Sequence, residues 1–169
     1  MLIRAARPED APSVARVHVS AWQAGYRHLL PREYLAQLRP EERAQRYDFA
    51  NTDMQRPKTI VAEDDGVIRG FATTAPARDA DMPDCGELCA LYVDPDWWGR
   101  GLGRTLLSAA RFRLAEMEYR QAVLWVLAGN LRAERCYRAD GWTSEGKTRR
   151  ETIWGIAVDE VLYVRSLQT

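Results

Sequence analysis

The spacing of apolar positions predicts two long amphipathic helices and three short ones. In residues 9–26, apolar side chains recur every three or four positions, at Val14, Val17, Ala21 and Trp22. The same period runs from about 101 to 118, at Leu102, Leu106, Ala110, Leu114 and Met117. Shorter helices are expected at 31–38, 40–50 and 130–141. The first two begin with a proline, and Asn130 can cap the third.

Other segments have the composition of β-strands. Residues 58–76 consist of two β-rich runs around Asp65 and Gly66, which is the pattern of a hairpin. Residues 121–128 are almost continuously apolar, as expected of a strand covered on both faces. Further strands are expected at 2–6, 86–94, 142–152 and 159–167, and a polar loop at 76–84. This order predicts one α/β domain over residues 1–169, with a mixed sheet and helices on both sides.

Composition and charge narrow the functional class. Apolar residues make up 46% of the chain, and 24 basic residues balance 24 acidic ones. A formal net charge of zero argues against a general nucleic-acid binder, which needs excess positive charge for phosphates. The chain shows no apolar run of the length of a signal peptide or membrane span, so a cytoplasmic protein without a membrane partner is expected.

The cysteines and histidines give no support to a metal site. The three cysteines, Cys85, Cys89 and Cys136, are an odd number and are expected to be reduced thiols. Cys85 and Cys89 can face one side of a strand, but neither has a histidine nearby. We therefore expect no structural zinc and no catalytic metal.

The segment DPDWWGRGLGRTLL, residues 94–107, leads from a predicted strand into a predicted helix. It holds Gly99, Gly101 and Gly103 together with Arg100 and Arg104. The first N–H groups of a helix lack intrahelical partners and attract anions, and glycine lets a phosphate approach them closely. The Gly-x-Gly-x-Gly spacing fits neither a P-loop nor the dinucleotide fingerprint. The segment predicts a phosphate cradle, with a ligand-free glycine-rich connection as the alternative.

The same stretch resembles the acetyl-CoA-binding motif of the GCN5-related N-acetyltransferases, the GNAT family, whose signature is Gln/Arg-x-x-Gly-x-Gly/Ala. Gly101 and Gly103 stand at the signature glycines, whereas Trp98 stands at the Gln/Arg position. In the family that position contributes mainly its backbone amide, so the change should be tolerated. NLRAERCYRADGW resembles a second family block, with matches at Asn130, Ala133, Tyr137, Gly141 and Trp142. The resemblance extends over nearly the whole chain and implies a twisted mixed sheet of six to seven strands flanked by four to five helices.

The resemblance implies direct transfer of the acetyl group of acetyl-CoA to a primary amine in a ternary complex. A base is required, because the amine has a pKa near 10 and only its neutral form attacks. Glu87, 14 residues before Gly101, resembles the strand glutamate of histone-acetylating members and is the expected base. A surface ion pair is the alternative role for Glu87, and Glu63 and Asp64 are weaker candidates. Tyr137 matches the family tyrosine that meets the coenzyme sulfur and is the expected acid.

The resemblance also implies which residues hold the coenzyme. Backbone groups of Leu91, Tyr92 and Val93 should contact the pantetheine arm. The pyrophosphate should lie against Gly99, Arg100, Gly101, Leu102, Gly103 and Arg104. Asn130 should contact the coenzyme while it also caps its helix.

The acceptor is less constrained by the sequence. Three aromatic residues and an acidic run would suit a cationic amine such as a polyamine, an aminoglycoside-like molecule or a peptide N-terminus. They are Trp22, Tyr26 and Tyr34, and Asp79, Asp81, Asp84 and Glu87. Protein lysines remain an alternative, as does a packed aromatic face beside a solvated loop. A homodimer is compatible with the sequence. Two other functions stay open: a non-catalytic acyl-CoA-binding or sensing module, and an enzyme that binds ATP or NAD with the same loop.

Overall fold

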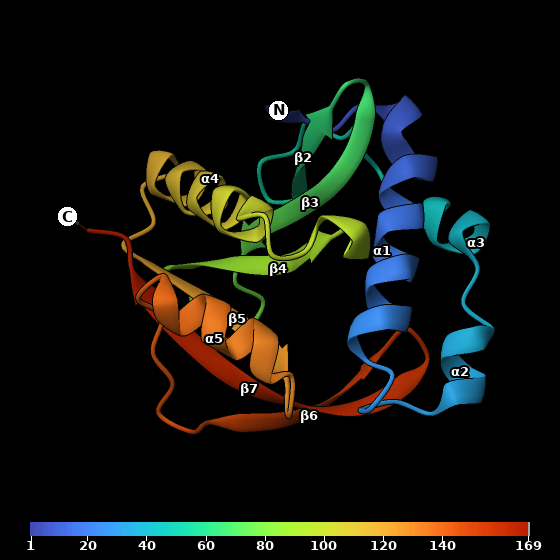
Figure 1. Cartoon of the computed structure of the whole chain (residues 1–169). Helices are drawn as coiled ribbons and strands as arrows, with labels where there is room; N and C mark the ends of the chain where they lie inside the picture. The colour runs from blue at the N-terminus through green and yellow to red at the C-terminus, as the bar shows by residue number, and fades with distance from the viewer. Residues whose placement is uncertain (169) are drawn as a thin grey trace.

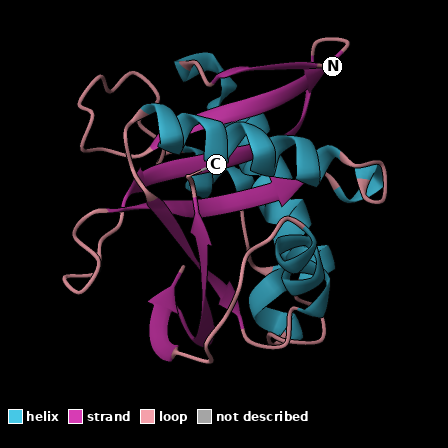
Figure 2. Cartoon of the chain, turned by 90° about the vertical axis from the view of Figure 1, so that its left-hand side faces the viewer, coloured by secondary structure: helices cyan, strands magenta, loops and turns pink. Residues whose placement is uncertain are grey.

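Seven strands form one mixed sheet in the computed structural model, which describes residues 1–168. The strands are β1 (Leu2–Ala5), β2 (Lys58–Asp64), β3 (Val67–Pro76), β4 (Cys85–Val93), β5 (Gln121–Leu127), β6 (Thr148–Ile153) and β7 (Ile156–Ser166). Their order in the sheet is β1-β2-β3-β4-β5-β7-β6, and every neighbouring pair is antiparallel except β4 and β5. The predicted fold class is confirmed. Figure 2 shows the twist of the sheet, in which the later strands turn away from the earlier ones.

Helices cover both faces of this sheet (Figure 1). They are α1 (Ala11–Gly25), α2 (Arg32–Ala36), α3 (Pro40–Ala44), α4 (Leu102–Glu116) and α5 (Leu131–Ala139), with 3-10 turns at Pro8–Asp10 and Pro95–Trp97. Adjacent residues of β2 show the two layers: Ile60 and Ala62 pack in the cluster below α4, while Val61 packs against α1. The predicted stripe of α1 is buried. Figure 1 shows α2 and α3 outside α1, away from the sheet.

The parallel pair β4 and β5 is joined at one end only. The two strands pair at three positions, and the last of these joins Glu87 to Val123. Just beyond, Thr74 pairs with Leu88 and Thr73 with Ala90, so Cys89 is the extra residue of a β-bulge. A bulge bends the strand that carries it. The unpaired halves of β4 and β5 therefore leave their backbone groups available on both sides of an opening.

Three predicted boundaries were wrong, and two of the errors have a cause in positive backbone φ angles. The strand expected at 142–152 begins only at Thr148, because Gly141 and Gly146 adopt φ of +88° and +84° and interrupt extended backbone. The helix expected at 40–50 ends at Ala44. The last strand begins at Ile156 rather than 159, since Trp154 and Gly155, with φ of +50° and +77°, form a tight hairpin turn. That turn carries Trp154 to the cleft described next.

Candidate active site

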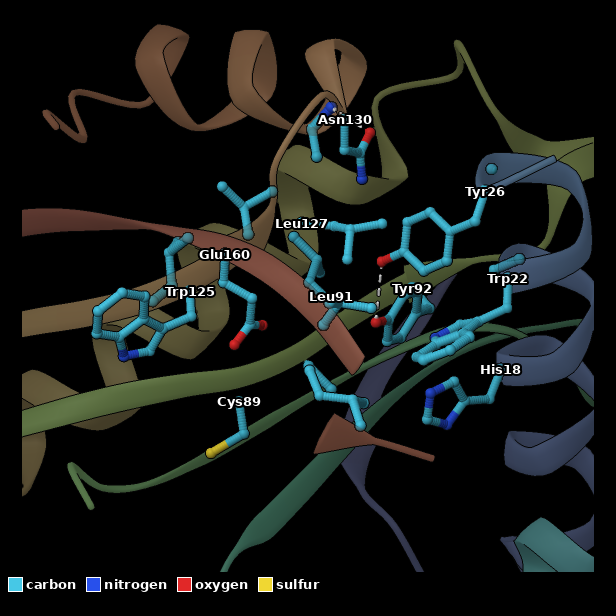
Figure 3. A pocket seen from close by; sticks show the side chains of 18 of the residues that line it. His18, Trp22, Tyr26, Cys89, Leu91, Tyr92, Trp125, Leu127, Asn130 and Glu160 are labelled. Carbon is cyan, nitrogen blue, oxygen red and sulfur yellow. Dashed lines mark hydrogen bonds between the residues drawn. The ribbon is translucent and has the colours of Figure 1, made fainter. Parts of the chain in front are cut away.

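Two adjoining cavities lie where β4 and β5 separate. The inner cavity, of about 170 Å³, is lined by both strands and by residues of α1 and α5 (Figure 3). The outer cavity, of about 580 Å³, extends past α3, residues 45–57 and the β6–β7 turn. Both cavities are bordered by His18, Arg43, Cys89, Trp125, Trp154 and Glu160. The consecutive residues Ala122, Val123 and Leu124 are buried, so β5 is covered on both faces there, whereas Trp125 borders the cleft.

The start of α4 has the geometry of an anion cradle. Gly101 caps the helix with φ of +83°, and Gly99 has φ of +77°. No atom lies within 4 Å of where a Cβ would stand on either glycine, so the space above the backbone is open. The first hydrogen bond of this turn runs from Thr105 N–H to the carbonyl oxygen of Gly101, at 3.1 Å. The preceding amides of the helix are therefore free to bind an anion.

A smaller cavity of about 100 Å³ connects β4 to this cradle. Its lining includes Leu91, Tyr92, Val93, Trp98, Gly103, Arg132 and Tyr137. Asn130 lines the inner cavity and accepts a hydrogen bond from Ala133 N–H at 3.3 Å, so it caps α5 as predicted. Arg100 and Arg104 are exposed near the cradle, and Arg100 stacks on Trp97 at 4.9 Å. The structure thus brings together most of the residues predicted to hold a coenzyme.

Trp98, the residue that departs from the family signature, is fixed by two contacts. Its Nε1 donates a hydrogen bond to the carbonyl oxygen of Val93 at 2.9 Å. The Arg132 guanidinium lies 3.4 Å from the centroid of its indole ring. Arg132 lines both the inner and the smaller cavity, and burial lowers its pKa without removing its charge. Sequence analysis missed Arg132, although it stands inside the second family block.

Tyr137 projects from α5 into the inner cavity. Its ring packs at 6.2 Å from Trp142 and 6.3 Å from Tyr163, which holds the side chain in place. Burial raises the pKa of its hydroxyl well above 10. The hydroxyl is therefore protonated at neutral pH and can donate a proton.

Glu87 borders the outer cavity and is nearly fully buried. Its carboxylate accepts a hydrogen bond from Arg78 N–H at 3.4 Å and lies 3.5 Å from the Arg78 guanidinium. Tyr137 lines the inner cavity, but Glu87 is not among the described residues that line it. Glu87 is thus beside the cleft, in an ion pair.

A second buried carboxylate, Glu160, shares the inner cavity with Tyr137. It stands on β7 opposite Leu127 of β5, borders both cavities and is 5% exposed. Figure 3 shows its carboxylate pointing into the same space as Cys89 and Leu91. It accepts a hydrogen bond from Arg149 Nε at 3.0 Å, and burial raises its pKa while Arg149 opposes the rise.

Sequence analysis missed Glu160, but the chain carries a signal for it. In β7 the residues that share its face are Val158 and Leu162, both buried. A glutamate within a buried alternating pattern is costly unless it is paired or used. The missed hairpin turn at Trp154 concealed this alternation.

The residues predicted for the acceptor are only partly gathered here. Trp22 and Tyr26 line the inner cavity, where the hydroxyls of Tyr26 and Tyr92 lie 3.3 Å apart. Tyr34 instead donates a hydrogen bond to the carbonyl of Trp154 and borders neither cavity. Asp79 pairs with Arg149 at 3.7 Å. Asp81 and Asp84 are exposed on the loop, away from the cleft lining.

The described residues lack two further features. Within residues 1–168, no three His, Cys, Asp or Glu side chains are grouped so that they could hold a metal ion. In the same residues, no helix has both the length and the apolar content needed to cross a membrane.

Comparison with known proteins places this architecture in a family. The Acetyltransferase (GNAT) family matches residues 22–142. The N-acetyltransferase YuaI of Bacillus subtilis, whose activity is uncharacterised, is 30% identical over 129 residues, which cover 76% of this chain and 72% of YuaI. Mycothiol acetyltransferase of Propionibacterium freudenreichii is 36% identical over 85 residues, or 50% of this chain, but the match spans only 27% of that longer protein.

Solved structures agree on the fold. PaiA N-acetyltransferase from Thermoplasma acidophilum, in complex with coenzyme A, has a TM-score of 0.76 at 18% identity, with 98% of each chain covered. YncA from Salmonella typhimurium, described as a putative acetyltransferase with its cofactor acetyl-CoA, has a TM-score of 0.73 at 20% identity and covers 100% of this chain and 95% of its own. The chain therefore belongs to the GNAT family, and its enzyme class is the one predicted from the sequence, an acetyl-CoA-dependent N-acetyltransferase.

Proposed function

We propose that the protein transfers the acetyl group of acetyl-CoA directly to a primary amine, and that the two substrates meet in the inner cavity. One observation carries the proposal: the cavity between the separated halves of β4 and β5 is lined both by Tyr137, whose hydroxyl is protonated, and by the buried carboxylate of Glu160. A proton donor and a proton acceptor in one cavity beside free strand backbone suit acyl transfer from a thioester.

The coenzyme would be held from the α4–α5 side. The free amides of residues 102–104 and the Arg132 guanidinium can bind the pyrophosphate oxygens, because both are N–H donors in a positive field. Leu91 to Val93 offer backbone groups to the pantetheine arm in the manner of an added strand. Bound there, acetyl-CoA supplies an activated thioester.

The chain's own groups then account for the proton movements. Glu160 accepts a proton from the amine, directly or through water, so that the neutral nitrogen can attack the carbonyl carbon. A backbone N–H of β4 near the bulge at Cys89 stabilises the negative charge that forms on the carbonyl oxygen. As the C–S bond breaks, Tyr137 gives its proton to the departing thiolate, and the second proton lost by the nitrogen restores the Tyr137 hydroxyl while Glu160 releases its proton to solvent.

Two carboxylates compete for the role of base. Glu87 is the base that the sequence predicts, while Glu160 shares the inner cavity with Tyr137 and has the raised pKa of a group poised to accept a proton. We assign the role of general base to Glu160. Glu87, in its ion pair with Arg78, would instead shape the wall of the outer cavity. Asn130 and Trp22 also line the inner cavity. We place Asn130 at its coenzyme end and Trp22 at its acceptor end.

Cys89 offers a second chemical route, through an acyl-cysteine. Although its side chain is exposed to the cleft, desolvation there and the neighbouring Glu87 raise the pKa of its thiol. Because the thiolate is the nucleophile, a thiol that stays protonated at neutral pH does not favour this route. Direct attack by the amine is therefore the mechanism proposed.

The test follows coenzyme A thiol release from acetyl-CoA across a panel of primary amines. We expect thiol release that depends on the amine and equals the acetylated product formed. Tight binding of acetyl-CoA without amine-dependent release would instead support a non-catalytic sensing module. Competition calorimetry with ATP and NAD separates the remaining alternative, because an enzyme for those nucleotides would bind them as well as coenzyme A.

A further inference from the structure

The charges around the cleft are not evenly balanced. On the β4–β7 side each carboxylate already has an arginine: Glu87 lies 3.5 Å from Arg78, and Glu160 lies 3.0 Å from Arg149. On the α3 side Arg43 borders both cavities. No carboxylate of residues 1–168 lies within ion-pairing distance of its guanidinium.

Aromatic rings hold Arg43 in this position. Its Cζ lies 4.9 Å from the ring centroid of Trp154 and 5.5 Å from that of Tyr47. Its Nε is buried and has no hydrogen-bond partner among residues 1–168. Cation–π contacts attract the charge but leave N–H donors unused, and a buried donor without an acceptor is costly. An acceptor from outside the chain would remove that cost.

Asp48 and Glu151 also border the outer cavity, but neither lies within ion-pairing distance of Arg43. The side chains whose pKa Arg43 influences are His18, Tyr34, Tyr47 and Tyr92. Burial lowers the pKa of His18, with Arg43 adding to the effect, and raises the pKa of the three tyrosines, so all four are neutral at neutral pH. The Arg43 end of the cleft therefore carries a positive charge on a planar guanidinium, a group that can bind a carboxylate through two parallel hydrogen bonds.

We propose that the amine acceptor is an amino acid, whose carboxylate binds Arg43 while its amine faces Glu160. This inference rests on the proposed function. Among the charged side chains of the described residues, only Arg43 and Glu160 border both cavities, so they are the two opposite charges that one small molecule can meet at the site of transfer. An amino acid carries the matching pair of groups.

The same charges disfavour the cationic acceptors suggested by the sequence. A polyamine would bring a second positive charge towards Arg43, which is repulsive. A lysine of a folded protein has no free carboxylate near its amine, since its main-chain carboxyl is part of a peptide bond. An inner cavity of about 170 Å³ also favours a small molecule over a protein loop.

The test compares matched acceptors in matched proteins. Each common amino acid is assayed beside the amine of the same carbon skeleton that lacks the carboxylate, for example leucine beside 3-methylbutylamine. The proteins are the wild type, Arg43→Met, Arg43→Lys and the control Arg46→Met, which removes an exposed arginine that borders only the outer cavity. Coenzyme A affinity and the thermal midpoint are measured for each protein.

We expect at least one amino acid to exceed its matched amine in kcat/KM by about tenfold or more in the wild type. Arg43→Met should lower kcat/KM for that amino acid by about 10- to 100-fold, the effect of losing a charge-assisted pair, and change that for the amine less than about twofold. Arg43→Lys should recover only part of the loss, and Arg46→Met should have no such effect.

The possible outcomes distinguish failure of the amino-acid inference from failure of the proposed acetyltransferase function. Amines acetylated as well as amino acids, with Arg43→Met affecting both equally, would overturn the amino-acid inference and leave the acetyltransferase mechanism standing. If Arg43→Met does not fold, the inference is still tested by the kcat/KM ratio of amino acid to matched amine in the wild type and in Arg43→Lys. If acetyl-CoA binds and no compound of either kind is acetylated, the proposed function fails together with this inference.

Discussion

The proposed coenzyme-binding and acceptor-binding regions differ in which parts of the chain form them. The proposed coenzyme side comes from two continuous segments, 91–107 and 130–142, and relies on backbone groups of β4 and on amides at the start of α4. The acceptor side gathers side chains from α1, α3, the β6–β7 turn and β7, which are far apart in the chain. A coenzyme common to a family can be held by backbone in a fixed local arrangement. An acceptor particular to one protein requires side chains, which change without disturbing the fold.

The largest expected effect is on the acceptor side, at the proposed base. Glu160→Gln keeps the shape of the side chain but cannot accept the proton, so kcat/KM should fall by about 100-fold or more. Glu87→Gln is the matched control, because it also removes a buried, arginine-paired carboxylate; its loss should be less than about tenfold. Steady-state rates for one amine with both variants test the assignment. A larger loss at Glu87 would return the role of base to the residue predicted from sequence.

The pH profile provides a second measurement on the same pair. Burial raises the pKa of Glu160 above its ordinary 4.5, and the carboxylate must be deprotonated to act. In the wild type, kcat/KM should therefore fall as the pH drops through this raised pKa. The Glu160→Gln variant should lack this acidic limb, while Glu87→Gln should retain it.

The next effect concerns Tyr137, where the two sides meet. Tyr137→Phe removes one hydroxyl, and we expect kcat to fall by about 10- to 100-fold. The loss should lie at the lower end of general-acid effects, because a thiolate with a pKa near 8.5 is already a fair leaving group. Dissociation constants for coenzyme A should agree within about twofold. Unchanged turnover would remove Tyr137 from the mechanism, and a loss confined to affinity would make it a binding residue.

This contrast also explains how much could be predicted from the sequence. The β2–β3 hairpin, the long helices and the cradle were predicted because each depends on neighbours in the chain: Asp65-Gly66 is a turn signal, and the glycines of 99–103 stand at a helix start. The hairpin turn at Trp154-Gly155 was missed, since tryptophan is not a usual turn residue. Arg43 and Glu160 meet only because α3 and β7 pack at the same opening, which no local pattern records.

A smaller effect is expected for Arg132 on the coenzyme side. Arg132→Met should weaken coenzyme A binding by about three- to tenfold, because one charged partner of the pyrophosphate is lost while the amides remain. Arg100→Met is the control: that arginine is exposed and stacks on Trp97, so its effect should be smaller. Calorimetry at two salt concentrations measures both variants. Equal losses in both would mean that the arginines act only through overall charge.

The smallest functional effect should come from Trp98, where the chain departs from the family signature. Trp98→Gln installs a signature residue but removes the hydrogen bond from Nε1 to Val93 and the ring beneath Arg132. The free energy of unfolding, measured with urea, should fall by about 1–2 kcal/mol. Coenzyme A affinity should change less than about threefold, because the amides of residues 102–104 carry the contact. A loss of affinity as large as that of Arg132→Met would show instead that the indole positions Arg132 for the pyrophosphate, so that a side chain and not backbone alone forms this edge of the coenzyme site.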